Sequence, residues 1–375
     1  MKNPLRNKKL WLYVSFIFLF SSIFFIFFYG KTISYKLDEN GQLINEIVVK
    51  KIPPLDKDDY DRRLNLLAHI ATSTLSTTTP ISTASSSSAT TTSTSTKIIK
   101  PSLWPVKTAY PNAGAVLPFK RIIAYYGNFL STSMGVLGEY PEDEMLAKLD
   151  VEVQKWTLAD PGTPAVPALH YIAVTAQGRP GADGKYRLRM SDTEINKVIT
   201  MAAKINALVF LDIQVGQSTI QDELPFLEKY LKMPNVHLAI DPEFAMKKGQ
   251  VPGAEYVGTM DAVDINYAID YLTELVNVNN LTPKILIVHR YRETMVTNYK
   301  KIKTVPEVQT VMNMDGWGAP SGKISIYKQY ITNQPVQFTG IKLFYKNDLW
   351  KPSTAMMTPE EILKLMPSPI YIQYQ

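Results

Sequence analysis

From Ile98 onward the chain alternates between short apolar runs and amphipathic segments. The apolar runs are rich in β-branched and aromatic residues, which is typical of buried parallel strands, and the segments between them have helical periodicity. Eight strands are predicted, over residues 122–126, 168–174, 207–214, 236–241, 284–289, 308–315, 338–345 and 370–375. Seven helices are predicted between them, over residues 141–158, 191–206, 219–232, 262–279, 294–301, 323–331 and 359–366. This strict alternation predicts an α/β protein of the (β/α)₈ TIM-barrel type.

Two of the predicted helices carry clear N-terminal signals. Ser191 and Thr358 each stand before an acidic first turn, where a hydroxyl can accept a backbone N–H and the carboxylates suit the helix dipole. An open doubly wound sheet is the alternative architecture. The first strand lacks the Gly-x-Gly-x-x-Gly turn that usually marks a dinucleotide site in such a sheet, so the barrel is favoured.

The N-terminal region has a different pattern. Residues 1–9 carry four positive charges, and residues 10–29 form an uncharged apolar run with seven of the fourteen phenylalanines. Twenty helical residues at about 1.5 Å each span a bilayer core of about 30 Å. The run exceeds a typical signal-peptide core and no small-x-small cleavage site follows it. The pattern predicts a single-pass signal anchor in the cell membrane with a cytoplasmic N-terminus and an extracytoplasmic C-terminal domain.

Between this anchor and the barrel lie two further segments. Residues 31–70 predict a hairpin followed by a charged helix in a juxtamembrane segment. Residues 71–97 form a linker, and within it twenty of the twenty-five residues from Thr72 to Thr96 are Ser or Thr, a composition typical of a disordered stalk. The barrel domain is then assigned to residues 98–375.

Charge and cysteine content narrow the chemistry. The net charge of +6 comes mainly from the first nine residues, so we expect no nucleic-acid partner. The chain has no cysteine, which excludes disulfides, thiolate metal sites and cysteine nucleophiles. The remaining catalytic candidates are carboxylates and imidazoles.

Polar and ionisable side chains interrupt the predicted strands near their C-terminal ends, where TIM barrels carry their active sites. Such groups are costly inside a parallel sheet unless they are paired or used, so their recurrence on several strands predicts a polar pocket. The predicted catalytic residues are Glu243, Asp241, Asp315 and Asp212. The predicted substrate-binding residues are Tyr126, His170, Gln214, His289, Arg290, Trp317, Lys342, Tyr345 and Gln373.

The sequence Asp241-Pro242-Glu243 places two carboxylates at the end of the fourth strand. If the strand continues extended, both side chains face one cavity, since alternate residues share a face. Mutual repulsion raises the pKa of one carboxyl group and suits it to act as a general acid. Together with aromatic side chains in the surrounding loops, the pair is typical of a glycoside-hydrolase cleft.

These residues support a resemblance. The chain resembles the glycoside-hydrolase-type TIM barrels, in which a glutamate ending the fourth strand is the proton donor, and the resemblance implies this role for Glu243. The sequence 312–315 on the sixth strand is similar to the Met-x-Tyr-Asp motif of the chitinase-like family, with Met314 in the tyrosine position. The seventh strand lacks the second glutamate of two-glutamate retaining enzymes. The segments 125–128, 211–216 and 241–246 also resemble uncharacterised exported bacterial barrel proteins.

The expected function is therefore a membrane-anchored, glycosidase-like hydrolase acting on cell-surface or cell-wall glycan, with no cofactor and no metal. Two alternatives remain open. The His and Asp/Glu residues at the strand ends could form the metal site of a metal-dependent hydrolase or phosphodiesterase. Alternatively, the missing glutamate on the seventh strand would suit a non-catalytic glycan-binding surface protein.

Overall fold

The structure is a computed structural model that describes residues 31–37, 43–49, 52–70, 103–247, 249–253 and 255–375. The chain divides into two units, Met1–Pro54 and Leu55–Gln375. The predicted cytoplasmic tail, membrane anchor and Ser/Thr-rich linker lie outside the described residues. Within the described ranges, no helix has the length and apolar character needed to cross a membrane.

In the first unit, β1 (Lys31–Leu37) and β2 (Leu43–Val49) form an antiparallel hairpin. The register pairs Lys31 with Val49 and Leu37 with Leu43. This confirms the predicted hairpin in the residues on both sides of its turn.

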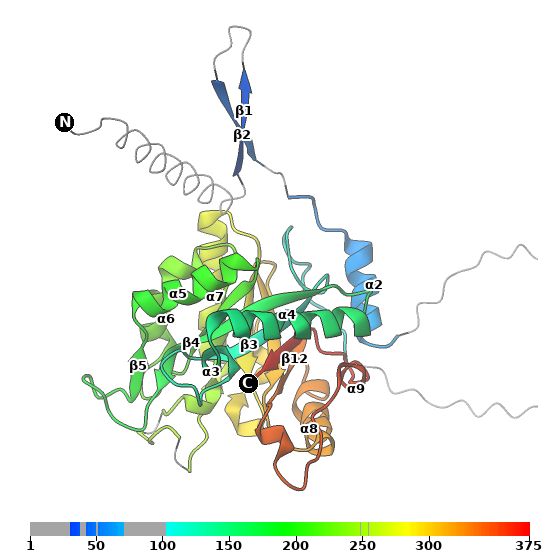
Figure 1. Cartoon of the computed structure of the whole chain (residues 1–375). Coiled ribbons are helices and arrows are strands. Elements are labelled where there is room, and N and C mark those ends of the chain that lie inside the picture. The colour runs from blue at the N-terminus through cyan, green and yellow to red at the C-terminus, as the bar shows by residue number, and fades with distance from the viewer. Residues whose placement is uncertain (1–30, 38–42, 50–51, 71–102, 248, 254) are drawn as a thin grey trace, which may run out of the picture. The chain divides into compact units, whose positions relative to one another are not determined.

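The second unit is built on a closed parallel barrel (Figure 1). Neighbouring strands pair around the ring in sequence order, and the last strand pairs with the first, which closes the sheet and confirms the predicted fold class. The eight strands are β3 (Arg121–Gly127), β4 (Ala165–Ala176), β6 (Leu208–Ile213), β7 (Val236–Ile240), β9 (Lys284–His289), β11 (Val308–Met314), β12 (Phe338–Leu343) and β13 (Tyr371–Tyr374). A short strand, β5 (Arg187–Arg189), extends the end of β4 in antiparallel orientation.

Helices fill most of the connections between strands and cover the outside of the barrel (Figure 1). They are α3 (Val136–Glu139), α4 (Glu142–Ala159), α5 (Asp192–Lys204), α6 (Ile220–Leu231), α7 (Ala262–Asn279), α8 (Pro320–Tyr327) with the π-helical turn η4 (Lys328–Thr332), and α9 (Pro359–Ile362). Ser191 and Thr358 are N-caps, as predicted, and Thr358 forms a capping box with Glu361.

One predicted helix is wrong. Residues 294–301 do not form an α-helix but the short elements η2 (Glu293–Met295), β10 (Val296–Thr297) and η3 (Tyr299–Lys301). Asn298 is in the left-handed conformation, which interrupts a helix, and its side chain donates to Asp261 Oδ2 at 2.5 Å. β10 pairs with β8 (Met260–Asp261), so this segment is held against the start of α7.

The N-terminal end of the barrel is closed by two segments that precede β3. Helix α2 (Lys57–Leu67), predicted from sequence as part of a juxtamembrane segment, belongs to the barrel unit. Trp104 and Leu117 come from the chain just before β3, and Trp104 donates a hydrogen bond to the Gln337 carbonyl at 2.6 Å. These side chains and the buried residues of α2 share one apolar cluster with the interior of the barrel.

The barrel interior changes character along its axis. In β3, Ile122 and Ala124 belong to the interior cluster, whereas Ile123 and Tyr125 pack against the helices outside. The next inward position, Tyr126, lies in the C-terminal half of the barrel. There the inward positions become polar, and they build the site described next.

Candidate active site

A cavity of about 820 Å³ opens at the C-terminal ends of the strands. Its polar lining includes Asp241, Glu243 and Asp315 together with Lys342. Its aromatic lining comprises Tyr126, Phe244, Tyr291, Trp317, Tyr330 and Phe344. The cavity thus combines carboxylates with flat apolar surfaces, and it lies at the end of the barrel where TIM-barrel enzymes have their active sites.

The turn after β7 places Glu243 in this cavity. The strand ends at Ile240, and Asp241 caps the 3-10 turn η1 (Pro242–Phe244) by accepting the Glu243 N–H at 3.0 Å. The expected extended continuation of the strand is therefore wrong, and a tight turn brings both carboxylates to the cavity. Gly258 stabilises the turn by donating its N–H to the Glu243 carbonyl at 2.5 Å. A Cβ at position 258 would lie 2.5 Å from the Pro242 oxygen, so only glycine fits there.

Three carboxyl groups meet at the cavity floor. Oxygen atoms of Asp241, Glu243 and Asp315 lie within 4.8 Å of one another. Burial raises the pKa of Asp241 well above its ordinary value, and the negative charges of Asp315 and Glu243 act in the same direction. The negative charges of the two neighbouring carboxylates therefore favour the protonated form of Asp241.

Glu243 has the environment of a proton donor. Burial raises its pKa, and the nearby charge of Asp315 raises it further. A hydrogen bond donated by Tyr291 Oη to Glu243 Oε1 at 3.0 Å, together with Lys342 and His289, acts in the opposite direction. The net shift keeps Glu243 protonated to higher pH than an ordinary glutamate, which is the property that a general acid needs.

Tyr126 and Lys342 form another wall of the cavity. The Lys342 ammonium lies 3.6 Å from the centre of the Tyr126 ring, in cation–π contact. Burial lowers the pKa of Lys342, while Asp315 and Asp241 oppose this change. Gln214 donates to Tyr126 Oη at 3.2 Å and so fixes the ring. The wall holds one cation next to three carboxyl groups.

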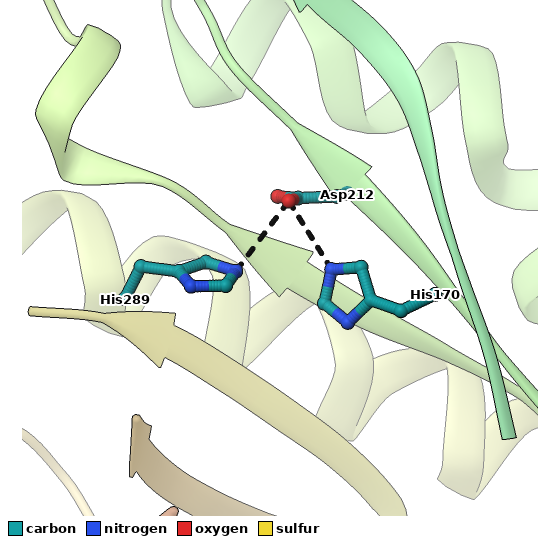
Figure 2. Close-up of side chains that lie close together, drawn as sticks. All are labelled: His170, Asp212 and His289. Carbon is teal, nitrogen blue, oxygen red and sulfur yellow. Dashed lines mark ion pairs between the residues drawn. The ribbon is translucent and has the colours of Figure 1, made fainter. Parts of the chain in front are cut away.

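Beneath the cavity floor lies a buried triad formed by His170 on β4, Asp212 on β6 and His289 on β9. Figure 2 shows the two imidazole rings pointing toward the Asp212 carboxylate from either side. Asp212 Oδ2 is 3.1 Å from His170 Nε2 and 3.4 Å from His289 Nε2. All three residues are fully buried.

The outer nitrogens of both imidazoles are also held. His170 Nδ1 lies 2.6 Å from Tyr371 Oη and 3.0 Å from the Gln373 amide nitrogen. His289 Nδ1 lies 3.2 Å from Asp315 Oδ2. Through His289 the triad is therefore connected to the carboxylates of the cavity.

The two imidazoles differ in charge. Burial lowers the pKa of His170 to about 4. Burial also acts to lower the pKa of His289, but the charges of Asp212 and Asp315 outweigh it and raise the value to about 10. Burial by itself would raise the pKa of Asp212, yet the adjacent His289 and His170 hold it below its ordinary value. In this protonation state His289 is the cationic member of the triad.

The structure distributes the predicted site residues over three places. The cavity lining contains Tyr126, Gln214, Asp241, Glu243, Asp315, Trp317 and Lys342. Buried beneath it are His170, Asp212, His289 and Gln373. Arg290 and Tyr345 belong to neither group.

Arg290 and Tyr345 were predicted as substrate-binding residues but point elsewhere. The Arg290 guanidinium is buried, and it donates to the backbone carbonyls of Arg292 and Tyr330 and to the Gln334 side chain. The Tyr345 ring stacks on Tyr374 at 5.3 Å and lines a separate outer groove. Both side chains stabilise the loops and the outer wall of the barrel.

Sequence reasoning missed several cavity residues. Tyr291, which contacts Glu243, follows directly after the predicted strand end at His289 and Arg290, so its position was a usable signal. Gln329 and Tyr330 come from the turn after α8, where no polar interruption of a strand marks them. Met134 and Gln375 complete this side of the lining.

Comparison with known proteins adds little to this geometry. No known family profile matches the chain, and no curated protein matches it. Among solved structures, GH26C from Muricauda sp. MAR_2010_75 is 11% identical, with a TM-score of 0.28 over 71% of this chain and 76% of that chain. A likeness at this level bears on neither fold nor function, so both are taken from the chain's own residues.

Proposed function

We propose that the cavity is the active site of a glycosidase-like hydrolase with Glu243 as the general acid. The observation that carries the proposal is the position of Glu243: a carboxyl group of raised pKa, at the end of the fourth barrel strand, in a cavity with two further carboxyl groups. The aromatic lining suits the apolar faces of sugar rings, and exposed Trp317 at its edge offers a stacking surface.

In the proposed reaction, Glu243 gives its proton to the glycosidic oxygen. The bond between this oxygen and the anomeric carbon breaks, and the electron pair leaves with the oxygen. A water molecule then adds its hydroxyl to the anomeric carbon and returns a proton to Glu243. Asp315 is the second carboxylate, because its contact with His289 holds it beside Glu243, where a negative charge stabilises an oxocarbenium-like transition state.

The spacing of the carboxyl groups indicates the stereochemical outcome. Inverting enzymes separate their two carboxyl groups by about 6.5–9.5 Å to leave room for a water, whereas retaining enzymes place them about 5–5.5 Å apart. One oxygen of Glu243 and one of Asp315 lie within 4.8 Å of each other, which is closer to the arrangement of retaining enzymes than to that of inverting ones.

The test is to incubate the full-length protein with cell-wall and cell-surface glycans and to follow the first-formed anomer by NMR. We expect hydrolysis with retained configuration, and a rate about 10²–10⁴-fold lower for the Glu243→Gln variant. Inverted product would contradict the assigned second carboxylate. Glycan binding without turnover would replace the enzyme proposal with that of a binding protein.

We also propose that residues 10–29 anchor the protein in the cell membrane, with the barrel outside the cytoplasm. The support is the uncharged apolar run behind four positive charges, followed by the Ser/Thr-rich linker. Fractionation and protease treatment of intact cells test this. We expect the barrel in the membrane fraction and accessible from outside, and a cytosolic or protected barrel would contradict the topology.

A further inference from the structure

The buried triad has several polar atoms that no hydrogen bond satisfies. Within the part of the chain that the structure describes, His170 Nε2, His289 Nε2 and both carboxylate oxygens of Asp212 lack a hydrogen-bond partner of acceptable geometry. Asp212 Oδ2 nevertheless lies within ion-pair distance of both imidazole nitrogens, so the three groups attract one another without forming well-aligned hydrogen bonds. Leaving four such atoms unsatisfied in a buried site is costly unless something between them accepts their lone pairs.

The spacing of these atoms fits a shared cation. In a tetrahedral site with metal–ligand bonds of about 2.0–2.1 Å, neighbouring ligand atoms lie about 3.4 Å apart. The two distances from Asp212 Oδ2 to the imidazole nitrogens are 3.1 and 3.4 Å. The three ligand atoms come from three strands of the barrel and lie within 4.8 Å of one another, and Figure 2 shows both imidazole rings pointing toward Asp212.

The surroundings of the two imidazoles support this interpretation. A metal-binding histidine usually has its second ring nitrogen held by a carboxylate or another polar group, which fixes the orientation of the ring. His289 Nδ1 faces Asp315 Oδ2 at 3.2 Å, and His170 Nδ1 faces Tyr371 Oη at 2.6 Å. Both rings thus present Nε2 toward Asp212, and the contacts at Nδ1 fix their orientation.

We propose that His170, Asp212 and His289 bind one divalent transition-metal ion of the zinc class beneath the cavity, where the ion takes the place of the proton on His289 Nε2. Two imidazole nitrogens favour Zn²⁺ and its neighbours over Mg²⁺ or Ca²⁺, which prefer all-oxygen sites. This replaces the sequence-based expectation of no metal. The site is separate from the carboxyl cluster of Asp241, Glu243 and Asp315, and it stands whether or not the protein hydrolyses glycans.

The site has a defined relation to the cavity. The Tyr126 ring, which lines the cavity, is 5.1 Å from the His170 ring and 6.2 Å from the His289 ring, so it covers the triad. His289 connects the cation to Asp315 through its other nitrogen. The bound ion would therefore fix the position of Asp315 as well as the triad itself.

The experiment is a metal analysis of the full-length protein. After removal of metal by a chelator and reconstitution with Zn²⁺, we expect about one equivalent bound, a raised melting temperature, and no such effect of Mg²⁺. Reconstitution with Co²⁺ should give the visible absorption of a low-symmetry site. Less than about a tenth of an equivalent of Zn²⁺, together with no Co²⁺ spectrum, would overturn the proposal.

Four variants locate the ion. Asp212→Asn and His289→Gln should lose it, whereas His237→Gln, a control for loss of another buried histidine in the barrel, should keep it. Tyr371→Phe removes the shorter of the two contacts at His170 Nδ1 and leaves Gln373 in place, and it should weaken Zn²⁺ binding by about 10-fold with the fold intact. If the triad variants do not fold, the Zn²⁺ affinity of Tyr371→Phe tests the assignment of the ligands. Full retention of metal in Asp212→Asn, or unchanged affinity in Tyr371→Phe, would show that the ion is bound elsewhere.

Discussion

The two ends of the barrel interior are built from the same eight strands but differ in chemistry. Toward the N-terminal ends, inward side chains such as Ile122, Phe210 and Phe338 join Trp104 and Leu117 in a sealed apolar cluster. Toward the C-terminal ends, the inward positions carry carboxylates, imidazoles and a lysine beneath an open cavity.

This difference separates stability from chemistry. Apolar burial at the closed end stabilises the fold in proportion to the area removed from water. At the open end, burial of ionisable groups is unfavourable by itself, and these groups are tolerated because they pair with one another. The stability from apolar burial at the closed end therefore offsets the cost of burying ionisable groups at the open end. These groups have shifted pKa values, a feature typical of functional sites.

The largest expected effect is at the open end. Glu243→Gln removes the proposed proton donor with little change in volume, so kcat should fall about 10²–10⁴-fold while the melting temperature stays close to that of the parent. Glu274→Gln, at an exposed position on α7, is the matched control and should keep full activity. An unchanged rate in the first variant would remove Glu243 from the mechanism.

A substitution at the closed end should instead lower stability and leave kcat unchanged. Leu117→Ala leaves a void in the fully buried cluster and should lower the free energy of unfolding by about 2–5 kcal/mol. Chemical denaturation measures this loss, and the folded fraction should keep its kcat. Leu103→Ala, at a largely exposed position in the same segment, should change stability by no more than about 0.5 kcal/mol. A large drop in kcat for Leu117→Ala would mean that the two ends are not separable.

The pH dependence of hydrolysis tests the charges around Glu243, which faces Asp315, Tyr291, Lys342 and His289. Because the protonated form is the active acid, kcat/KM should fall as pH rises through its raised pKa. Asp315→Asn removes a negative charge that raises this pKa, so the alkaline limb of the residual activity should move to lower pH.

Lys342→Met is the matched opposite change. It removes a positive charge that lowers the pKa of Glu243, so the alkaline limb should move to higher pH. Profiles of kcat/KM against pH for both variants measure the two shifts. If both limbs moved in the same direction, or neither moved, another group would be responsible for the titration.

The smallest effect is expected at the rim of the open end. Trp317 lines the cavity, and its ring packs edge-on against Trp350 at 5.0 Å. Trp317→Ala should raise KM for a glycan by roughly 3- to 10-fold with little change in kcat, since it removes a stacking surface and no reacting group. Trp350→Ala, which alters an equally exposed tryptophan that does not line the cavity, should have less effect. Equal KM values for the two variants would argue against stacking on Trp317.

The sequence predicted the strands well because each is a short apolar run between turn residues, and the observed bounds differ from the predicted ones by only a few residues. It failed at 294–301, where helical periodicity was outweighed by the left-handed Asn298 and the pairing of β10 with β8. It also misplaced Arg290. His289 faces the interior, and adjacent strand residues face opposite sides, so this error was avoidable from the sequence.

Other features required the closed barrel. His170, Asp212 and His289 lie far apart in the chain, on the second, third and fifth strands, and no local pattern pairs them. The same holds for the contact of Tyr291 with Glu243, which depends on the loop after β9.

By itself, the sequence determined the order of strands and helices, the helix caps and the kinds of ionisable side chain at the strand ends, because these depend on local periodicity and residue chemistry. Only the tertiary structure decided which of those side chains share a cavity, which are buried as a triad and which face outward. Strand closure and register bring distant residues within a few ångströms of each other, and the shifted pKa values arise from that proximity and burial.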